Sequence, residues 1–387
     1  MKPVQITKDV YWVGGIDWDL RNFHGYLTQR GSTYNAYLIV DEKITLIDTV
    51  KYYLVDEMLE RISAVVDPAK IDYIVSNHVE MDHSGGLPRL MEMLPGATII
   101  TSPKGEEGLK KHYKKDWKFK VVQSGETVNI GKRDLTYVMT PMVHWPDNMV
   151  CYSAKDKILF SNDAFGQHVA TSERFDDEYH IDIINEEAMK YYANIVLPYS
   201  VQVQKALADL EGLDIDVIAP SHGILWRKNI AGIIENYRKW SSNETDNKAL
   251  IIYDTMWKST EKMAFAIQNA FENKNIFARM FNLQHNHISD IMTEVLTARY
   301  ICVGSPTLNK NMLPTVAAFL TYFKGLAPKG RKGLAFGSYG WAPFGVKQVD
   351  EALQSCKFDM MDAIQLQYVP NPSDLKEITA KVQSQIS

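Results

Sequence analysis

Six consecutive residues, His-Val-Glu-Met-Asp-His at positions 78–83, constrain the fold of this chain more than any other stretch. Four of their side chains can bind a metal ion, namely His78, Glu80, Asp82 and His83. The apolar run 71–76 predicts a strand before them, and two glycines and an expected helix from Leu87 follow. If the loop is extended, alternate side chains face opposite ways, so it could serve two adjacent metal ions. A solvated turn is the alternative, and distant residues argue against it.

Three later predicted strands also end in a metal-competent residue. The runs 135–143, 157–162 and 215–221 lead into His144, Asp163 and His222. Loops at strand ends gather at one edge of a sheet, where site residues collect. Seven donors are too many for one tetrahedral zinc ion, so two metal ions are expected. Asp163, the carboxylate that comes alone from its own strand end, is the expected bridge between them. A bridging hydroxide or oxide would offset the charge added by oxidation of the metals.

The bulk composition is that of a two-domain globular protein. The chain has 387 residues, of which 45% are hydrophobic and 23% charged. The net charge of -5 argues against a general nucleic-acid binder. Three isolated cysteines indicate neither a disulfide framework nor a cysteine-held cluster. The N-terminus lacks the apolar core of a signal peptide, and no apolar run reaches the length of a membrane span, so we expect a cytoplasmic protein.

A polar stretch at 241–248 has the composition of a linker, which predicts domains at 1–247 and 248–387. Strands and helices alternate after it, as in a doubly wound parallel sheet. The loops after its first, third and fourth strands carry hydroxyls and aromatic rings, which suit a phosphate and a flat ring. The candidate cofactor-binding residues are Thr255, Met256, Trp257, Lys258, Ser259, Thr260, Ser305, Pro306, Thr307, Leu308, Asn309, Ser338, Tyr339, Gly340 and Trp341.

The pattern H-x-E-x-D-H, followed by a distant His, Asp and His, resembles the metallo-β-lactamase superfamily and, more narrowly, the flavodiiron proteins. These are the A-type flavoproteins, which include rubredoxin:oxygen oxidoreductases and nitric oxide reductases. The resemblance implies an α/β protein with an N-terminal αββα sandwich and a C-terminal flavodoxin-like domain that binds FMN. Glu80 stands where the hydrolases have a second histidine, and a carboxylate there favours iron over zinc. By the same resemblance, one iron is held by His78, Glu80 and His144, the other by Asp82, His83 and His222, and Asp163 bridges them.

The implied activity is reduction of O2 to water, of NO to N2O, or of both, with electrons from a rubredoxin-like protein. The resemblance also implies a head-to-tail homodimer, or a dimer of such dimers, with no nucleic-acid or membrane partner. Two alternatives remain at this point. One is a di-zinc hydrolase of the metallo-β-lactamase type with an accessory flavodoxin-like domain. The other is an electron carrier or redox sensor that uses FMN alone.

Two further residues are candidates for a catalytic role behind the ligands. His24 resembles a histidine that supports the metal site in the family, and a surface-loop histidine is the alternative. Tyr192 could place a hydroxyl near the metals, although packing along an amphipathic helix is the preferred interpretation. The segment 145–147, Trp-Pro-Asp, is expected to hold the loop of His144 rigid.

Overall fold

The computed structural model describes residues 1–386, which divide into two compact units. The first unit comprises Met1–His24, Thr28–Tyr191 and Val201–Arg238. The second comprises Gly25–Leu27, Tyr192–Ser200 and the residues from Lys239 onward. The predicted boundary between residues 247 and 248 stays a prediction, because two short segments from earlier in the chain group with the second unit.

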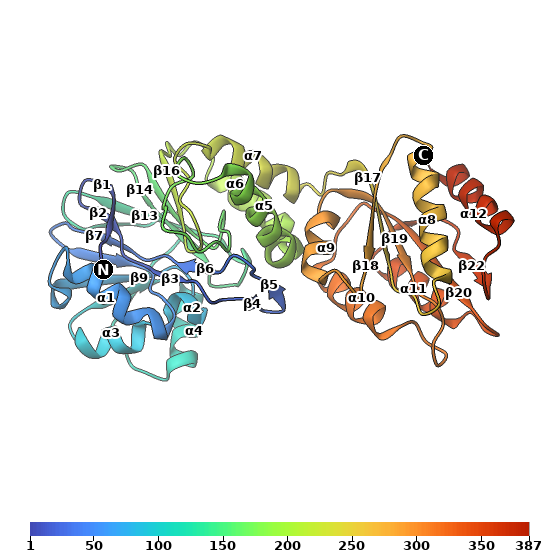
Figure 1. Cartoon of the computed structure of the whole chain (residues 1–387). Helices are drawn as coiled ribbons and strands as arrows, with labels where there is room; N and C mark the ends of the chain where they lie inside the picture. The colour runs from blue at the N-terminus through green and yellow to red at the C-terminus, as the bar shows by residue number, and fades with distance from the viewer. Residues whose placement is uncertain (387) are drawn as a thin grey trace. The chain divides into compact units, whose positions relative to one another are not determined.

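The first unit contains two β-sheets (Figure 1). The larger sheet has, in spatial order, β1 (Val4–Thr7), β2 (Val10–Trp12), β7 (Tyr37–Ile39), β8 (Ile44–Ile47), β9 (Ile71–Ser76), β10 (Thr98–Thr101) and β11 (Phe119–Val121). The smaller has β12 (Thr127–Asn129), β13 (Asp134–Met139), β14 (Met149–Ser153), β15 (Ile158–Asn162) and β16 (Val217–Pro220). Short strands β3 (Gly15–Asp17), β4 (Asn22–Phe23), β5 (Tyr26–Leu27) and β6 (Ser32–Tyr34) lie between β2 and β7 in the chain.

One apolar core joins the two sheets and a second lies under the helices. Alternate side chains of β2, β7 and β9 pack against those of β13, β14 and β15 in a fully buried cluster. The other face of the larger sheet packs against helices that follow its strands. The helices of this part of the chain are α1 (Val55–Ser63), α2 (Met81–Ser84), α3 (Leu87–Met93), α4 (Pro103–Tyr113), α5 (Ile181–Tyr191), α6 (Ser200–Asp209) and α7 (Ile230–Ser241), with single turns η1 (Tyr52–Leu54), η2 (Pro68–Lys70), η3 (Tyr192–Val196) and η4 (Leu197–Tyr199). This layering of helix, sheet, sheet and helix is the expected αββα sandwich.

The second unit is a doubly wound sheet. Its strands are β17 (Asp246–Tyr253), β18 (Phe277–Asn282), β19 (Ala298–Gly304), β20 (Lys332–Tyr339), β21 (Asp359–Met360) and β22 (Ile364–Gln367), and its helices are α8 (Ser259–Glu272), α9 (Ile288–Val295), α10 (Pro314–Leu326), α11 (Phe344–Ser355) and α12 (Pro372–Gln385). The order β18-β17-β19-β20-β22 is parallel throughout. Figure 1 shows α8 and α12 side by side on one face of the sheet and α9 and α10 on the other. The order reverses at β17, so the loops after β17 and β19 flank a crevice for a ligand.

The expected linker is shorter than its composition suggested. Helix α7 continues to Ser241 and strand β17 already begins at Asp246. The polar residues 246–248 extend the strand beyond its buried part because the backbone of Asp246 donates to the carbonyl of Thr297 (2.7 Å). No helix within residues 1–386 is long and apolar enough to cross a membrane.

Candidate metal centre and cofactor pocket

The metal-competent loop after β9 is partly helical. The backbone N–H groups of His83 and Ser84 donate to the carbonyl of Glu80 (3.0 and 2.9 Å), and the Ser84 hydroxyl donates to the carbonyl of Val79 (2.7 Å). These bonds start the short helix α2 at Met81. The loop is therefore not extended, and the alternation of side chains that an extended loop would give does not occur. Asp82 and His83 lie on a helical turn, and both point into the same group of ligands, whereas Glu80 before the helix points into another.

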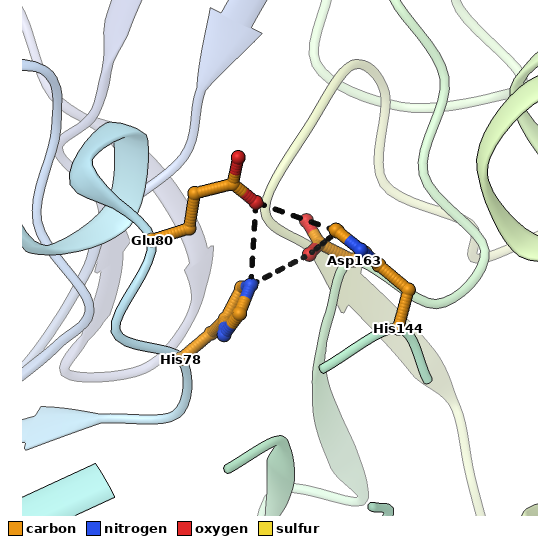
Figure 2. Close-up of side chains that lie close together, drawn as sticks. All are labelled: His78, Glu80, His144 and Asp163. Carbon is orange, nitrogen blue, oxygen red and sulfur yellow. Dashed lines mark ion pairs between the residues drawn. The ribbon is translucent and has the colours of Figure 1, made fainter. Parts of the chain in front are cut away.

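The first ligand group consists of four buried side chains from three strand ends: His78, Glu80, His144 and Asp163. Figure 2 shows them converging, with His78 and Glu80 approaching from one side and His144 and Asp163 from the other. Oε2 of Glu80 lies 3.4 Å from Nε2 of His78 and 3.5 Å from Nε2 of His144. Oδ2 of Asp163 lies 3.7 and 3.2 Å from the same two nitrogens.

The second ligand group consists of Asp82, His83 and His222, which are also buried. Nε2 of His83 lies 3.4 Å from Oδ1 of Asp82, and Nε2 of His222 lies 3.3 Å from Oδ2 of Asp82. The other oxygen of Asp163, Oδ1, faces this group at 3.0 Å from His83 and 3.4 Å from His222. Asp163 thus presents one oxygen to each group, which is the arrangement of a carboxylate that bridges two metals.

The spacing of these atoms fits bound metal ions. Ligand atoms about 2.0–2.2 Å from a common metal in tetrahedral or octahedral geometry lie roughly 2.8–3.6 Å from one another. Seven of the eight distances between 3.0 and 3.7 Å fall in that range. The groups are therefore spaced to share a metal ion each rather than to bond directly.

Unused hydrogen-bonding capacity also fits the presence of metals. Nε2 of His78, Nε2 of His83 and the carboxylate oxygens of Asp82 and Asp163 are buried and make no hydrogen bond within residues 1–386. Buried polar atoms without a partner are costly, and a concentration of them indicates an ion that completes the site. Imidazole and carboxylate together suit iron, whereas thiolates, which favour zinc and copper(I), do not contribute to either group.

Hydrogen bonds behind the ligands fix their orientation. Oδ2 of Asp147 accepts from Nδ1 of His78 (2.8 Å) and from the backbone N–H of Val79 (2.7 Å). The carbonyl of Thr33 accepts from Nδ1 of His222 (2.9 Å). These bonds leave Nε2 as the atom that faces the metal in each case. Asp147 was expected to hold the loop of His144 rigid, and its bond to His78 was not predicted. No local signal marks Thr33, whose carbonyl acts across 189 residues.

His24 lies against the first ligand group. Its Nε2 is 2.7 Å from Oε1 of Glu80, and its side chain is 60% exposed. The other predicted supporting residue, Tyr192, has its hydroxyl 3.3 Å from Ser200 and its ring 5.3 Å from Trp240. The ring of its neighbour Tyr191 instead lies 6.0 Å from His222. The catalytic roles of His24 and Tyr192 stay predictions.

Charge and burial compete at these groups. Burial opposes ionisation of Glu80, but the neighbouring His24 and His78 imidazoles outweigh it and lower the pKa of Glu80 to about 2. Burial also opposes the charge on His222, but the nearby Asp163 and Asp82 carboxylates raise its pKa to about 10. The carboxylates are therefore ready to accept cations, and a metal that binds His222 must displace its proton.

The second unit contains a cavity of about 640 Å³ at the carboxyl ends of its strands. Twelve of the fifteen predicted cofactor-binding residues line it, from all three predicted loops. Trp257 and Trp341 lie at its rim with exposed fractions of 87% and 89%. The Thr255 hydroxyl near the start of α8 is buried without a hydrogen-bond partner in the described chain. A phosphate at this helix N-terminus would supply that partner, and a flat ring would cover the indoles.

Three predicted cofactor residues do not line the cavity. The Ser305 hydroxyl accepts from the backbone N–H of Leu313 (2.9 Å), Thr260 lies 3.3 Å from the Ser338 hydroxyl, and Lys258 pairs with Glu261. They hold the loops in place. The residues that line the cavity without being predicted are Lys310, Ala342, Phe344, Tyr368 and Val369. The last two follow β22, so the rule applied to the other strand ends would have found them.

Two family models match the chain. The model described as ODP family beta lactamase covers residues 33–223, and the flavodoxin model covers residues 251–381. The chain is 43% identical over 396 residues to a nitric oxide reductase from Moorella thermoacetica, with 100% of this chain and 99% of the relative covered. It also matches the structure of rubredoxin oxygen:oxidoreductase from Desulfovibrio gigas with a TM-score of 0.97, 41% identity and coverage of 99% and 97%.

The flavodiiron protein from Giardia intestinalis matches with a TM-score of 0.96 and 35% identity, over 99% of this chain and 96% of that one. The chain belongs to the flavodiiron protein family. Both halves of the expected fold, the metallo-β-lactamase-like sandwich and the flavodoxin-like sheet, are thereby confirmed for this flavodiiron protein.

Proposed function

We propose that this flavodiiron protein reduces O2 to two waters with four electrons, or couples two NO to N2O and water with two electrons. The observation that carries the proposal is Asp163, whose two oxygens face two separate ligand groups. Metals held about 3.5–4 Å apart can accept both atoms of O2 or two NO molecules side by side. Two iron ions would supply redox chemistry at this place, and FMN in the second unit would supply further electrons.

The chain's own residues would set the conditions for that chemistry. His78, Glu80 and His144 would hold one iron, and Asp82, His83 and His222 the other. His24 touches Glu80 from the exposed side and can hand a proton to the site from solvent. The buried carboxylates and imidazoles keep the metals apart from bulk water elsewhere. Relatives named for oxygen and nitric oxide reduction favour this oxidoreductase over the hydrolase alternative.

Steady-state consumption of O2 and of NO by iron- and FMN-loaded protein tests the proposal. Both gases are supplied separately with the same chemically reduced rubredoxin-like donor. Consumption of one or both is expected. A protein that holds zinc, contains no flavin and hydrolyses a phosphodiester or thioester would contradict it. Full gas consumption by a Glu80→Ala variant would instead support an FMN-only electron carrier.

We also propose a cytoplasmic head-to-tail homodimer, in which the FMN of one chain serves the irons of its partner. The family resemblance supports this arrangement. Co-expression of Asp163→Asn chains, which lack metal, with Thr255→Glu chains, which repel the FMN phosphate, tests it. Random pairing should restore about a quarter of wild-type activity, since half of the dimers then hold one complete pair of cofactors. Transfer within one chain would restore none.

A further inference from the structure

Two apolar cavities lie one behind the other on the outer side of the smaller sheet. The outer cavity, of about 400 Å³, opens between α6 and α7 and over Leu159 and Ile218 of β15 and β16. The inner cavity, of about 20 Å³, lies deeper in the first unit. Phe165, Leu207 and Leu210 line both. These three side chains therefore border both the inner cavity and the outer one.

Two residues that line the inner cavity are chain neighbours of ligands in the first group. Val143 and Ala164 line it. Val143 precedes His144, and Ala164 follows Asp163, so the Cα atom of Ala164 lies about 3.8 Å from that of Asp163. His144 and Asp163 belong to the same group and approach its metal position from the same side (Figure 2). A molecule in this cavity would therefore contact residues that are bonded directly to two of the four ligands.

The lining of the inner cavity is almost entirely hydrocarbon, whereas the outer cavity is mostly apolar with Glu211 and Arg238 in its lining. The Tyr237 hydroxyl, one of the few polar groups of the inner cavity, accepts the backbone N–H of Phe165 (2.7 Å). Cavities without polar partners stay dry and accept apolar guests such as xenon. The inner volume exceeds the roughly 10–15 Å³ that one water-sized molecule needs. Such a cavity rejects ions and strongly hydrated molecules and accepts a small uncharged gas.

We propose that the outer and inner cavities form a passage that binds uncharged diatomic gas and delivers it to the first ligand group. This inference rests on the proposed function for the identity of the gas. The competing route is the side of His24, which is 60% exposed beside Glu80 and is open to water. The apolar passage concentrates a gas from solvent, because apolar surface favours it over water, whereas the polar side does not.

Xenon binding to the complete protein tests the passage independently of activity. Crystals pressurised with xenon, or xenon NMR in solution, should show an atom in contact with Ala164 and Val143. Ala206→Phe should exclude it, because Ala206 lines the inner cavity. Ala208→Phe is the matched control, since Ala208 lies on the exposed side of the same helix. Leu207 lines both cavities, so Leu207→Ala should widen the space between them and increase xenon occupancy. This variant keeps the test decisive if Ala206→Phe fails to fold.

Gas kinetics complete the test. Ala206→Phe should lower the second-order rate constant of the reduced protein with O2 or NO by about tenfold, with unchanged iron and FMN content and unchanged kcat at saturating gas. Ala208→Phe should match wild type. Absence of xenon from the wild-type inner cavity overturns the inference, as does an unchanged rate constant in an Ala206→Phe protein that excludes xenon. If loaded wild type consumes neither gas, the proposed function fails, and the xenon result alone decides whether the passage is a gas site.

Discussion

Replacement of Asp147 by Asn should weaken one metal position and spare the other. A single oxygen of Asp147 accepts both Nδ1–H of His78 and the backbone N–H of Val79. The residue is 4% exposed, and its own carbonyl accepts the Ser102 hydroxyl (2.7 Å). Asparagine keeps the shape and the carbonyl, but it loses the charge and can turn its NH2 group toward the imidazole.

The magnitude follows from the bond that is lost. A hydrogen bond to a charged group contributes about 1.5–3 kcal/mol. Groups that orient a metal-bound histidine typically change metal affinity by about 10–100-fold, which corresponds to the same energy. Asp147→Asn should therefore raise the Kd of the first ligand group for Fe(II) by this factor. The second group should be unaffected, because His222 is held by the carbonyl of Thr33 instead.

Anaerobic titration of the apoprotein with Fe(II) against a competing chelator measures both sites. Asp176→Asn is the matched control, since Asp176 is equally buried and accepts the backbone N–H groups of Arg227, Lys228 and Asn229 away from the ligands. It should lower Tm without changing either iron affinity. The reasoning would be refuted if Asp147→Asn kept the wild-type Fe(II) affinity at both sites, or if Asp176→Asn lost as much Fe(II) affinity as Asp147→Asn.

Three further outcomes are expected. Asp163→Asn should lose one or both metals by elemental analysis while flavin absorbance persists. Trp341→Ala should raise the FMN Kd by roughly fivefold, as for a lost aromatic contact of about 1 kcal/mol, and should leave the iron content unchanged. Loss of both cofactors together in either Asp163→Asn or Trp341→Ala would contradict the independence of the two units. Burial raises the pKa of Glu187 to about 7 although Lys190 and Arg30 oppose it. The folded state therefore holds a proton that the unfolded state releases near its ordinary pKa, and stability should fall by up to about 3 kcal/mol as pH rises from 4.5 through 7. Glu187→Gln should flatten this part of the Tm profile, whereas Glu186→Gln, on the exposed side of α5, should retain it.

The strand-end rule located the metal centre correctly from sequence. His144, Asp163 and His222 each follow a strand whose β-branched and aromatic residues are visible locally. Once those strands share a sheet edge, their ends must converge. The helical turn α2 was not predictable in the same way. Its residues 81–84 carry no helical period, and the turn forms because Glu80 and Val79 offer their carbonyls to residues 83 and 84.

The sequence of the second unit predicted the strands of its sheet better than the residues at which those strands begin and the segments that join the unit. Apolar runs marked the buried parts of β17 and β19 but not the polar first residues of β17, where Asp246 pairs with Lys239 and Lys248 pairs with Glu294. Segments 25–27 and 192–200 group with this unit although they lie earlier in the chain, between parts of the first unit. There the Leu27 N–H meets the Ser289 hydroxyl (3.2 Å) and Asn194 bonds to the Ser289 carbonyl (3.0 Å). Contacts across such sequence distances leave no periodic signal.

The two ligand groups differ in a way that depends only on tertiary acceptors. His78 and His222 each have Nδ1 held from behind, by Asp147 and by Thr33. Both ring nitrogens of His83 are buried and make no hydrogen bond within the described residues. An imidazole without such a bond has no fixed tautomer and is oriented by its metal alone. The first ligand group therefore has a histidine held by a carboxylate, whereas the second has one held by a backbone carbonyl and, in His83, one that its metal alone would orient.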